Sequence, residues 1–419
     1  MSLSEATPRS VAPSMRNTAR LIDRARPHFE AAHHAGVMGV FGRSLGGRRV
    51  ELHTSGQSPH EVVDFVRCAY LGLDNHPAIV AGAIAAIEKY GAVHWSCART
   101  RLNFGLIGDL EDDLSDLFDA RVITYSTVLA ANMSALPLLA SGHLTAGQKP
   151  LMVFDRLAHA TLAFHKPVVA AETTVTTIAH NDLDALETLC RQHPTVAYIC
   201  DGVYSMGGAA PISALLELQA RYGLFLYVDD AHGISLHGAR GQGFARAQIP
   251  GGLGSRTLIA ASLGKGFGAS GGLIMLGTPE QESLFRSFAV AHAFSASPNL
   301  AAVGAALASA RLHRTPELAH LQNALKVRLA HFDALVPTAQ AGQPLPIRTI
   351  RVGDAYDAIE AARVILERGA YVSAIFFPTV AQGEAGLRLC PTAAHTVDEL
   401  EAVADAVRAA LAPQLQTTA

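Results

Sequence analysis

The sequence predicts an α/β protein built on a mostly parallel sheet in a large domain, with a smaller α+β domain at the C-terminal end. Short apolar runs alternate with helical patterns between residues 121 and 276. Acidic or basic residues follow several of these runs directly. Alternation with short connections is typical of a parallel sheet covered by helices on both faces. We therefore expect ligands to bind at the carboxyl ends of its strands.

The composition indicates a well-buried globular enzyme. Of the 419 residues, 49% are hydrophobic and 16% are charged, which excludes a disordered chain. The net charge of -3 gives no reason to expect a nucleic-acid partner. Five scattered cysteines form no CxxC pair and no secretory signal is visible, so we expect reduced thiols, a cytoplasmic location and no metal site. The uncharged stretch 122–148 contains Asn132 and Pro137, which favour a strand and a buried helix over a membrane span.

Residues 1–74 are predicted to form an N-terminal helix and hairpin segment. A polar, Pro- and Ser-rich start precedes a charged helical pattern at Thr18–His34. FGRSLGGRRVEL then predicts a hairpin with Gly46 and Gly47 at its turn. The following VVDFVRCAYLGL predicts a strand that leads into the next domain.

Residues 75–300 are predicted to form the large domain. An Ala- and Ile-rich helix covers Pro77–Tyr90, and an arginine-containing loop follows at 91–111. The predicted strands are 121–125, 150–154, 175–179, 196–200, 224–228, 257–261 and 271–276. The predicted helices between them are 127–140, 182–193 and 212–222. Ala- and Leu-rich helices and short strands then predict a small domain over 301–419, with a helix at Ala355–Glu367.

Two of the predicted strands lead to residues that suit an aldehyde cofactor. LFLYVDDAHG stops at Asp229, with His232 just beyond, and the next apolar run leads to Lys265 among glycines. A lysine can hold such a cofactor as a Schiff base, and a carboxylate raises the pKa of a pyridinium nitrogen by opposite charge. Alone, either residue fits a helix cap or a surface turn. Together, each after a strand, they favour pyridoxal 5′-phosphate (PLP) as the cofactor.

Several motifs resemble those of one enzyme family, in the same order along the chain. The motifs VDDAHG, SLGKGFGASGG, DGVYSMGGAAP, FDRLAHATL, YLGLDNHP and LRLCPTAAH are similar to segments of the α-oxoamine synthases. The resemblance implies a fold-type I PLP-dependent transferase that works as a homodimer with shared active sites. It also implies a decarboxylative condensation of a small amino acid with an acyl thioester, giving an α-aminoketone, CO2 and a free thiol. The thioester would be acyl-coenzyme A or an acyl-carrier protein.

The resemblance implies a role for each matching residue. Lys265 would hold the cofactor and later act as a base, while Asp229 would hold the ring nitrogen. His232 would hydrogen-bond the phenolic oxygen or the incoming carbonyl, His159 would stack on the ring, and Arg388 would pair with the substrate carboxylate. The other implied cofactor contacts are Asp201, Ser205, Ser262 and the backbone N–H groups of Thr127, Val128 and Leu129. The last three belong to a helix N-terminus, which suits a phosphate.

The chain departs from the family pattern at several positions. Cys68 stands where relatives have an asparagine that helps to hold the amino acid. Ile107 replaces a histidine, Val128 a glycine and Ala296 a threonine. A thiol cannot replace the hydrogen bonds of an amide, so we expect substrate handling to differ at Cys68. The arginines of loop 91–111 either lie in solvent or, with the tryptophan, reshape the acyl pocket or the thioester entrance.

Two other functions remain open from the sequence. A different fold-type I PLP reaction, such as transamination or aldol cleavage, would consume no acyl thioester and release no CO2. A non-catalytic PLP-binding protein would need neither Lys265 nor Arg388, and the chain has both. The sequence does not choose among small amino acids or between the two kinds of acyl donor.

Overall fold

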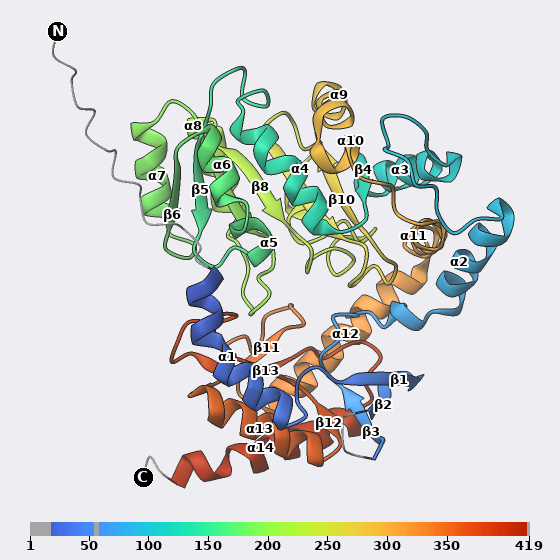
Figure 1. Ribbon diagram of the computed structural model, residues 1–419, viewed down its shortest axis with the longest axis vertical. Coiled ribbons are helices and arrows are strands. Elements are labelled where there is room, and N and C mark those ends of the chain that lie inside the picture. The colour runs from blue at the N-terminus through green and yellow to red at the C-terminus, as the bar shows by residue number, and fades with distance from the viewer. Residues whose placement is uncertain (1–17, 54–57, 417–419) are drawn as a thin grey trace.

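The computed structural model describes residues 18–53 and 58–416. Its centre is a seven-stranded sheet (Figure 1). In order across the sheet the strands are β4 (Arg121–Tyr125), β10 (Gly272–Leu276), β9 (Thr257–Ser262), β8 (Phe225–Asp229), β7 (Val196–Asp201), β5 (Leu151–Asp155) and β6 (Val175–Ile178). Strand β10 is antiparallel to both of its neighbours, whereas the other pairs are parallel. The predicted mostly parallel α/β sheet is confirmed.

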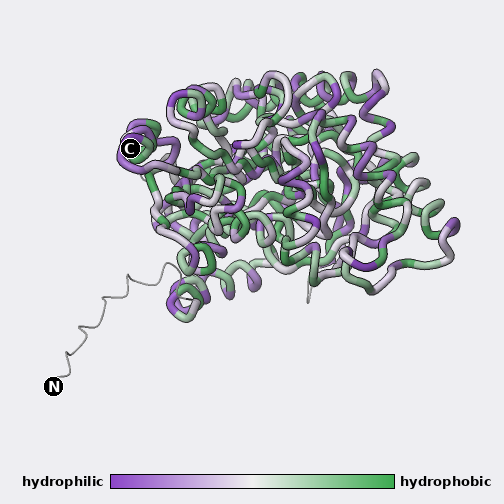
Figure 2. The backbone as a smooth tube through the Cα atoms, turned by 90° about the horizontal axis from the view of Figure 1, so that it is seen from above, coloured by the Kyte–Doolittle hydropathy of each residue, from purple (hydrophilic) through white to green (hydrophobic). Residues whose placement is uncertain are grey.

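Each strand of this sheet sends alternate side chains into two apolar layers. In β7, Tyr198 and Cys200 join one hydrophobic cluster, while Ala197 and Ile199 join the other. Helices α3 (Gly105–Phe118), α7 (Leu183–Gln192), α8 (Ile212–Tyr222) and α11 (Leu300–Leu312) complete the first cluster. Helices α4 (Val128–Ala140), α5 (Ala160–Ala163), α6 (Lys166–Glu172), α9 (Pro279–Phe288) and α10 (Val290–Ala293) complete the second. Figure 2 shows hydrophobic and hydrophilic residues interleaved along the backbone throughout the molecule.

A smaller unit combines the two ends of the described chain. Figure 1 shows the blue N-terminal elements beside the red C-terminal ones. One sheet joins β1 (Phe41–Gly46), β2 (Arg49–His53), β3 (His60–Asp64) and β12 (Ala370–Tyr371). A second joins β11 (Arg348–Gly353), β14 (Ala385–Leu389) and β13 (Ser373–Ile375). The helices of this unit are α1 (Thr18–His34), α12 (Pro316–Leu335), α13 (Ala355–Glu367) and α14 (Val397–Gln416).

Packing links segments that are far apart in the sequence. Phe65, near the N-terminus, and Leu400, near the C-terminus, belong to one buried cluster. Helix α11 packs against α2 (Pro77–Tyr90), where a Cβ at Gly82 would lie 2.7 Å from the carbonyl oxygen of Gly304, so both helices need glycine at the crossing. The predicted division into 1–74, 75–300 and 301–419 stays a prediction. Two short 3-10 helices, Leu73–Asn75 and Arg246–Gln248, complete the described elements.

The structure confirms the predicted hairpin but contradicts the second part of one predicted strand. Strands β1 and β2 pair antiparallel, and Gly46 and Gly47 have φ of 99° and 53°, which confirms the hairpin. The predicted strand through VVDFVRCAYLGL is wrong beyond Asp64, where β3 ends. The Asp64 carboxylate accepts the backbone N–H groups of Val66 and Arg67 at 2.8 and 3.1 Å, which turns the chain.

No helix within 18–53 and 58–416 is long and apolar enough to cross a membrane.

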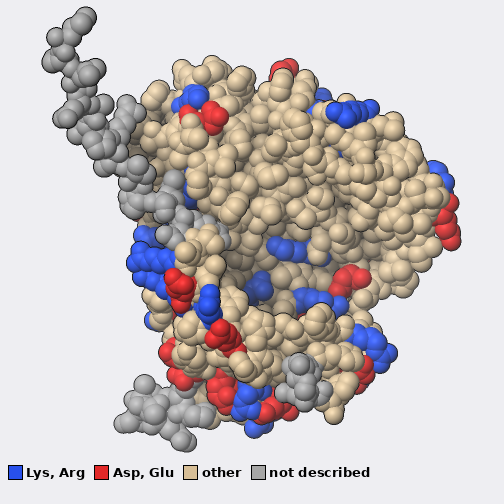
Figure 3. Space-filling view, viewed as in Figure 1, with Lys and Arg blue, Asp and Glu red and all other residues tan. Residues whose placement is uncertain are grey.

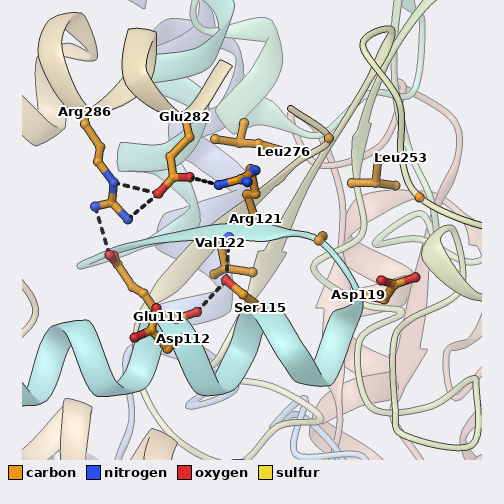
Figure 4. Close-up of a pocket in the computed structure, with 13 residues that line it drawn as sticks. Glu111, Asp112, Ser115, Asp119, Arg121, Val122, Leu253, Leu276, Glu282 and Arg286 are labelled. Carbon is orange, nitrogen blue, oxygen red and sulfur yellow. Dashed lines mark hydrogen bonds and ion pairs between the residues drawn. The ribbon is translucent and has the colours of Figure 1, made fainter. Parts of the chain in front are cut away.

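A buried carboxylate organises the region below loop 91–111. Glu111 Oε1 accepts hydrogen bonds from Arg99 at 2.9 Å and from the backbone N–H of Thr124 at 2.7 Å. Arg99 also donates to the carbonyl of Thr124 at 2.6 Å. Arg99 is therefore buried in this network and does not lie in solvent. Figure 4 shows Arg286 bridging Glu111 and Glu282 at the edge of a cavity of about 440 Å³. The hydrogen bond from Thr124 joins α3 to β4, and the ion pair with Arg286 joins α3 to α9.

Glu111→Gln is expected to destabilise the fold by about 3–5 kcal/mol, because it removes one charge of a buried ion-pair network. The Glu111 and Arg99 side chains are only 5% and 4% exposed, so solvent screens them little. Urea unfolding measures the loss. The neighbouring exposed Asp112 provides the matched variant, Asp112→Asn, which should change stability by less than about 0.5 kcal/mol. Equal stability of the two variants would contradict a structural role for Glu111.

Candidate active site

The predicted site residues gather at the carboxyl edge of the seven-stranded sheet. Asp201 and Asp229 end neighbouring parallel strands and are register partners. Lys265 follows the next strand, β9. A cavity of about 290 Å³ opens at this edge. Of the predicted site residues, it is lined by Thr127, Val128, His159, Asp201, Asp229, His232, Ser262 and Lys265.

A second cavity, of about 870 Å³, adjoins the first and lies between the large and small units. Its lining includes the predicted residues Cys68, Ser205 and Arg388, and it shares His159, His232 and Lys265 with the first cavity. Figure 3 shows the surface hollowed between the two units, with Lys and Arg side chains in the hollow. Leu129 lines neither cavity in the described structure, and its side chain is 45% exposed.

The Asp229 carboxylate is held by groups on both of its oxygens. The Asn132 side-chain amide donates to Oδ2 at 3.0 Å, and the backbone N–H of Ala231 donates to Oδ1 at 3.1 Å. Tyr227 in turn donates to Asn132 Oδ1 at 2.7 Å. Asn132 is fully buried on α4. The sequence shows it only as a polar residue in an apolar helix, and its contact with Asp229 was not predicted.

Asn132→Ala is expected to weaken PLP binding about tenfold and to cost about 1–3 kcal/mol of stability. The substitution leaves the Tyr227 hydroxyl and one Asp229 oxygen without their buried partner. Titration of the cofactor by absorbance and urea unfolding measure the two effects. Gln192→Ala, which removes an amide at an exposed position of α7, is the control and should keep wild-type affinity. Wild-type affinity in Asn132→Ala would show that Asn132 does not position Asp229.

Lys265, His232 and Tyr70 form a buried chain of polar contacts. Lys265 Nζ lies 2.8 Å from His232 Nε2, and the Tyr70 hydroxyl lies 2.6 Å from His232 Nδ1. Burial lowers the pKa of the Lys265 amine, although the charge of Asp229 opposes this effect. Burial also lowers the pKa of His232 well below its usual range. A neutral imidazole accepts from one of its partners and donates to the other, so His232 can fix both Lys265 and Tyr70.

His159 is held beside the end of β7. Its backbone N–H donates to Asp201 Oδ1 at 3.0 Å, and its Nδ1 lies 2.9 Å from Thr161 Oγ1. Burial lowers the pKa of His159. Burial, with the charge of Asp229, raises the pKa of Asp201 well above its usual range. The His159 ring is therefore neutral and fixed at the cavity wall.

The N-terminus of α4 faces the smaller cavity. Thr127 caps this helix of 13 residues, because its Oγ1 accepts the backbone N–H of Ala130 at 3.2 Å. Gly272 passes so close that a Cβ there would lie 2.4 Å from the backbone nitrogen of Val128. The helix dipole and the free N–H groups at this end favour an anion. Val128 itself lines this cavity.

These groups fit PLP at its phosphate, at its ring nitrogen and at its aldehyde. The α4 N-terminus and the Ser262 hydroxyl suit a phosphate, the Asp229 carboxylate suits a pyridinium nitrogen, and the Lys265 amine suits an aldehyde. Both Asp229 and Lys265 line one cavity. Fold and site thus define a PLP-dependent transferase of fold type I.

Comparison with known proteins gives the family. Residues 101–407 match the model of the family described as aminotransferase class I and II. The chain is 34% identical over 366 residues to 8-amino-7-oxononanoate synthase of Sodalis glossinidius, with 83% of this chain and 87% of the relative covered. The chain belongs to this aminotransferase class I and II family and, within it, to the α-oxoamine synthases.

Solved structures agree on the fold. Serine palmitoyltransferase of Sphingomonas wittichii is 20% identical with a TM-score of 0.81, and the alignment covers 96% of this chain and 100% of that one. The 8-amino-7-oxononanoate synthase of Francisella tularensis is 19% identical with a TM-score of 0.68, covering 84% and 99%.

Proposed function

We propose that the protein condenses a small amino acid with an acyl thioester and releases CO2 and a free thiol. One observation supports this most strongly. Lys265 and Arg388 line the same cavity of about 870 Å³, so an amine and a guanidinium face one space large enough for two substrates. The relatives named as 8-amino-7-oxononanoate synthases support the same reaction class.

The chain's own residues have distinct tasks in this reaction. When bound, PLP supplies an electron sink for negative charge at the substrate Cα. Arg388 binds the substrate carboxylate, and Asp229 keeps the ring nitrogen protonated through its opposite charge. The Lys265 amine, made less basic by burial, removes the Cα proton. His232 holds that amine in place, and Tyr70 holds His232.

The larger cavity also suits an anionic acyl donor. Apolar side chains from three segments, Leu157, Met206 and Val380, form part of its wall. Its charged lining residues are Arg156, Lys166, Lys265, Arg388 and Glu384. Apart from the cofactor-holding Lys265, three basic side chains against one carboxylate attract a donor that carries phosphates. Coenzyme A and the prosthetic group of an acyl-carrier protein both do.

The test of this function pairs candidate amino acids with acyl donors. Glycine, alanine or serine, each labelled with ¹³C in the carboxyl group, is incubated with acyl-coenzyme A or with an acyl-carrier protein. We expect labelled CO2, free thiol and a product whose mass is that of the α-aminoketone. Transfer of the amino group without loss of label would indicate an aminotransferase. The absence of any turnover would favour a non-catalytic PLP-binding protein.

We infer in addition a cytoplasmic homodimer with shared active sites. Helix α4 packs beside α9 and α10, and this region exposes large apolar side chains. They are Leu129, Met133, Phe288 and Phe294, exposed by 45%, 38%, 69% and 84%. A second copy of the chain would cover such a surface. Sedimentation should then give twice the chain mass. The five cysteines, all free, support a reducing compartment.

A further inference from the structure

Cys68 is in direct contact with the arginine that faces the larger cavity. The Arg388 Nη2 group lies 3.5 Å from Cys68 Sγ, and Arg388 Nε donates to the carbonyl of Ser205 at 2.7 Å. Arg388 is only 8% exposed. Within the described chain, no Asp or Glu forms an ion pair with Arg388. The thiol is therefore the group available to balance this buried charge.

Most polar neighbours of Cys68 favour the thiolate, against one long contact of its Sγ with the Val66 carbonyl at 3.9 Å. Four groups face the Cys68 thiol. Tyr70 belongs to the same segment as Cys68, and Arg388 lies on β14. Cys390 directly follows β14, and Lys265 lies on the loop after β9. A hydrogen bond from Cys390, together with the charge of Arg388, holds the pKa of the Cys68 thiol well below its usual range despite burial. The pKa of Cys390 is raised well above its usual range, so Cys390 remains a thiol and can donate. His159, His232 and Glu384 line the same cavity, and Asp64 lies toward Cys390.

We propose that the Cys68 thiolate is the counter-ion of Arg388 in the free enzyme, and that a substrate carboxylate binds together with one proton, which converts this thiolate into a thiol. This inference rests on the proposed role of Arg388 as the carboxylate partner. Arg388 Nε is already used by Ser205, so carboxylate and thiolate compete for the remaining N–H groups. The substrate carboxylate and the Cys68 thiolate repel each other beside one buried guanidinium. This repulsion raises the pKa of the Cys68 thiol, which is the weaker of the two acids.

The sign of the pH dependence follows from this exchange. Below the pKa of Cys68 in the free enzyme, the thiol is already protonated and no proton is needed. Above it, each bound carboxylate requires one proton from solution, so affinity falls about tenfold per pH unit. The fall ends at the higher pKa of the thiol in the complex. An asparagine, the residue of relatives, carries no charge at this position and gives no such proton uptake.

The first measurement follows the thiolate itself and does not depend on turnover. The holoenzyme is treated with iodoacetamide across a pH series, and the alkylation rate at Cys68 is read from peptide masses. We expect a pKa well below the usual value of about 8.5. Arg388→Met should raise it by about 1–3 units, whereas Arg408→Met, at an exposed arginine of α14, should not move it. An ordinary Cys68 pKa in the wild type would overturn the inference.

The second measurement counts protons. Calorimetric titration with propanoate, a carboxylate without an amine, is run at pH 7 in two buffers that differ in ionisation enthalpy. We expect uptake of close to one proton per propanoate in the wild type and none in Cys68→Asn. Absence of proton uptake, or of propanoate binding, in the wild type would overturn the inference. Undiminished propanoate affinity in Arg388→Met would instead overturn the proposed role of Arg388, while the low thiol pKa would stand.

Discussion

Lys265→Ala is expected to lose turnover by more than about 10³-fold while the protein keeps its fold. The substitution removes both the covalent attachment point of the cofactor and the base that removes the Cα proton. It also removes the contact with His232 at 2.8 Å. A buried lysine without a carboxylate in hydrogen-bond distance contributes little to stability, so the folded state should persist.

The measurement for Lys265→Ala combines product formation with near-visible absorbance. Product formation and the absorbance band of the Schiff base between lysine and cofactor should both be lost, while circular dichroism stays that of the wild type. Lys89→Ala, at an exposed position of α2, is the control and should retain full activity. A near-normal rate in Lys265→Ala would refute the assignment of this residue.

Asp229→Asn is expected to lower the turnover number by about 10²–10³-fold and to weaken retention of PLP. Both carboxylate oxygens already accept hydrogen bonds, from Asn132 and from Ala231. An amide in the same place carries no charge, so it cannot keep the ring nitrogen protonated. Steady-state kinetics with the amino acid saturating measures the loss, and dialysis measures cofactor retention.

Asp230 offers a matched control for that substitution. It is equally buried, its Oδ2 accepts the backbone N–H of Ala245 at 2.9 Å, and its Oδ1 has no hydrogen-bond partner in the described structure. Burial raises the pKa of Asp230 to about 8, so the residue is mostly protonated at pH 7. Asp230→Asn therefore preserves charge and shape, and turnover should remain close to wild type. Equal losses in the two variants would show that the Asp229 effect is structural.

The strands and the residues at their ends could be predicted from the sequence because both signals are local. An apolar run followed by Asp229, or by Lys265 among glycines, marks a buried strand and the point where it ends. Parallel strands bring their carboxyl ends to one edge, so the meeting of Asp201, Asp229 and Lys265 followed from topology. The early end of β3 was missed, because the Asp64 carboxylate that turns the chain acts through a short-range contact within an apolar pattern.

The supporting contacts of the site could not be predicted, because their partners are distant in the sequence. Asn132 lies 97 residues from Asp229, and Tyr70 lies 162 residues from His232. Nothing in a single sequence marks such a pair. Likewise, the departure at Cys68 was visible as a residue change. Its consequence depends on the Arg388 guanidinium, which the fold places 3.5 Å away.

The central claim is that Lys265 holds PLP at the carboxyl edge of the sheet, opposite Asp229. Reduction of the holoenzyme with borohydride converts the bond between cofactor and lysine into a stable amine, and peptide mass spectrometry then locates it. The account predicts a pyridoxyl-phosphate group on the peptide that contains Lys265 and on no other. Its presence on a different lysine, or its absence from every peptide of a cofactor-loaded sample, would contradict the account.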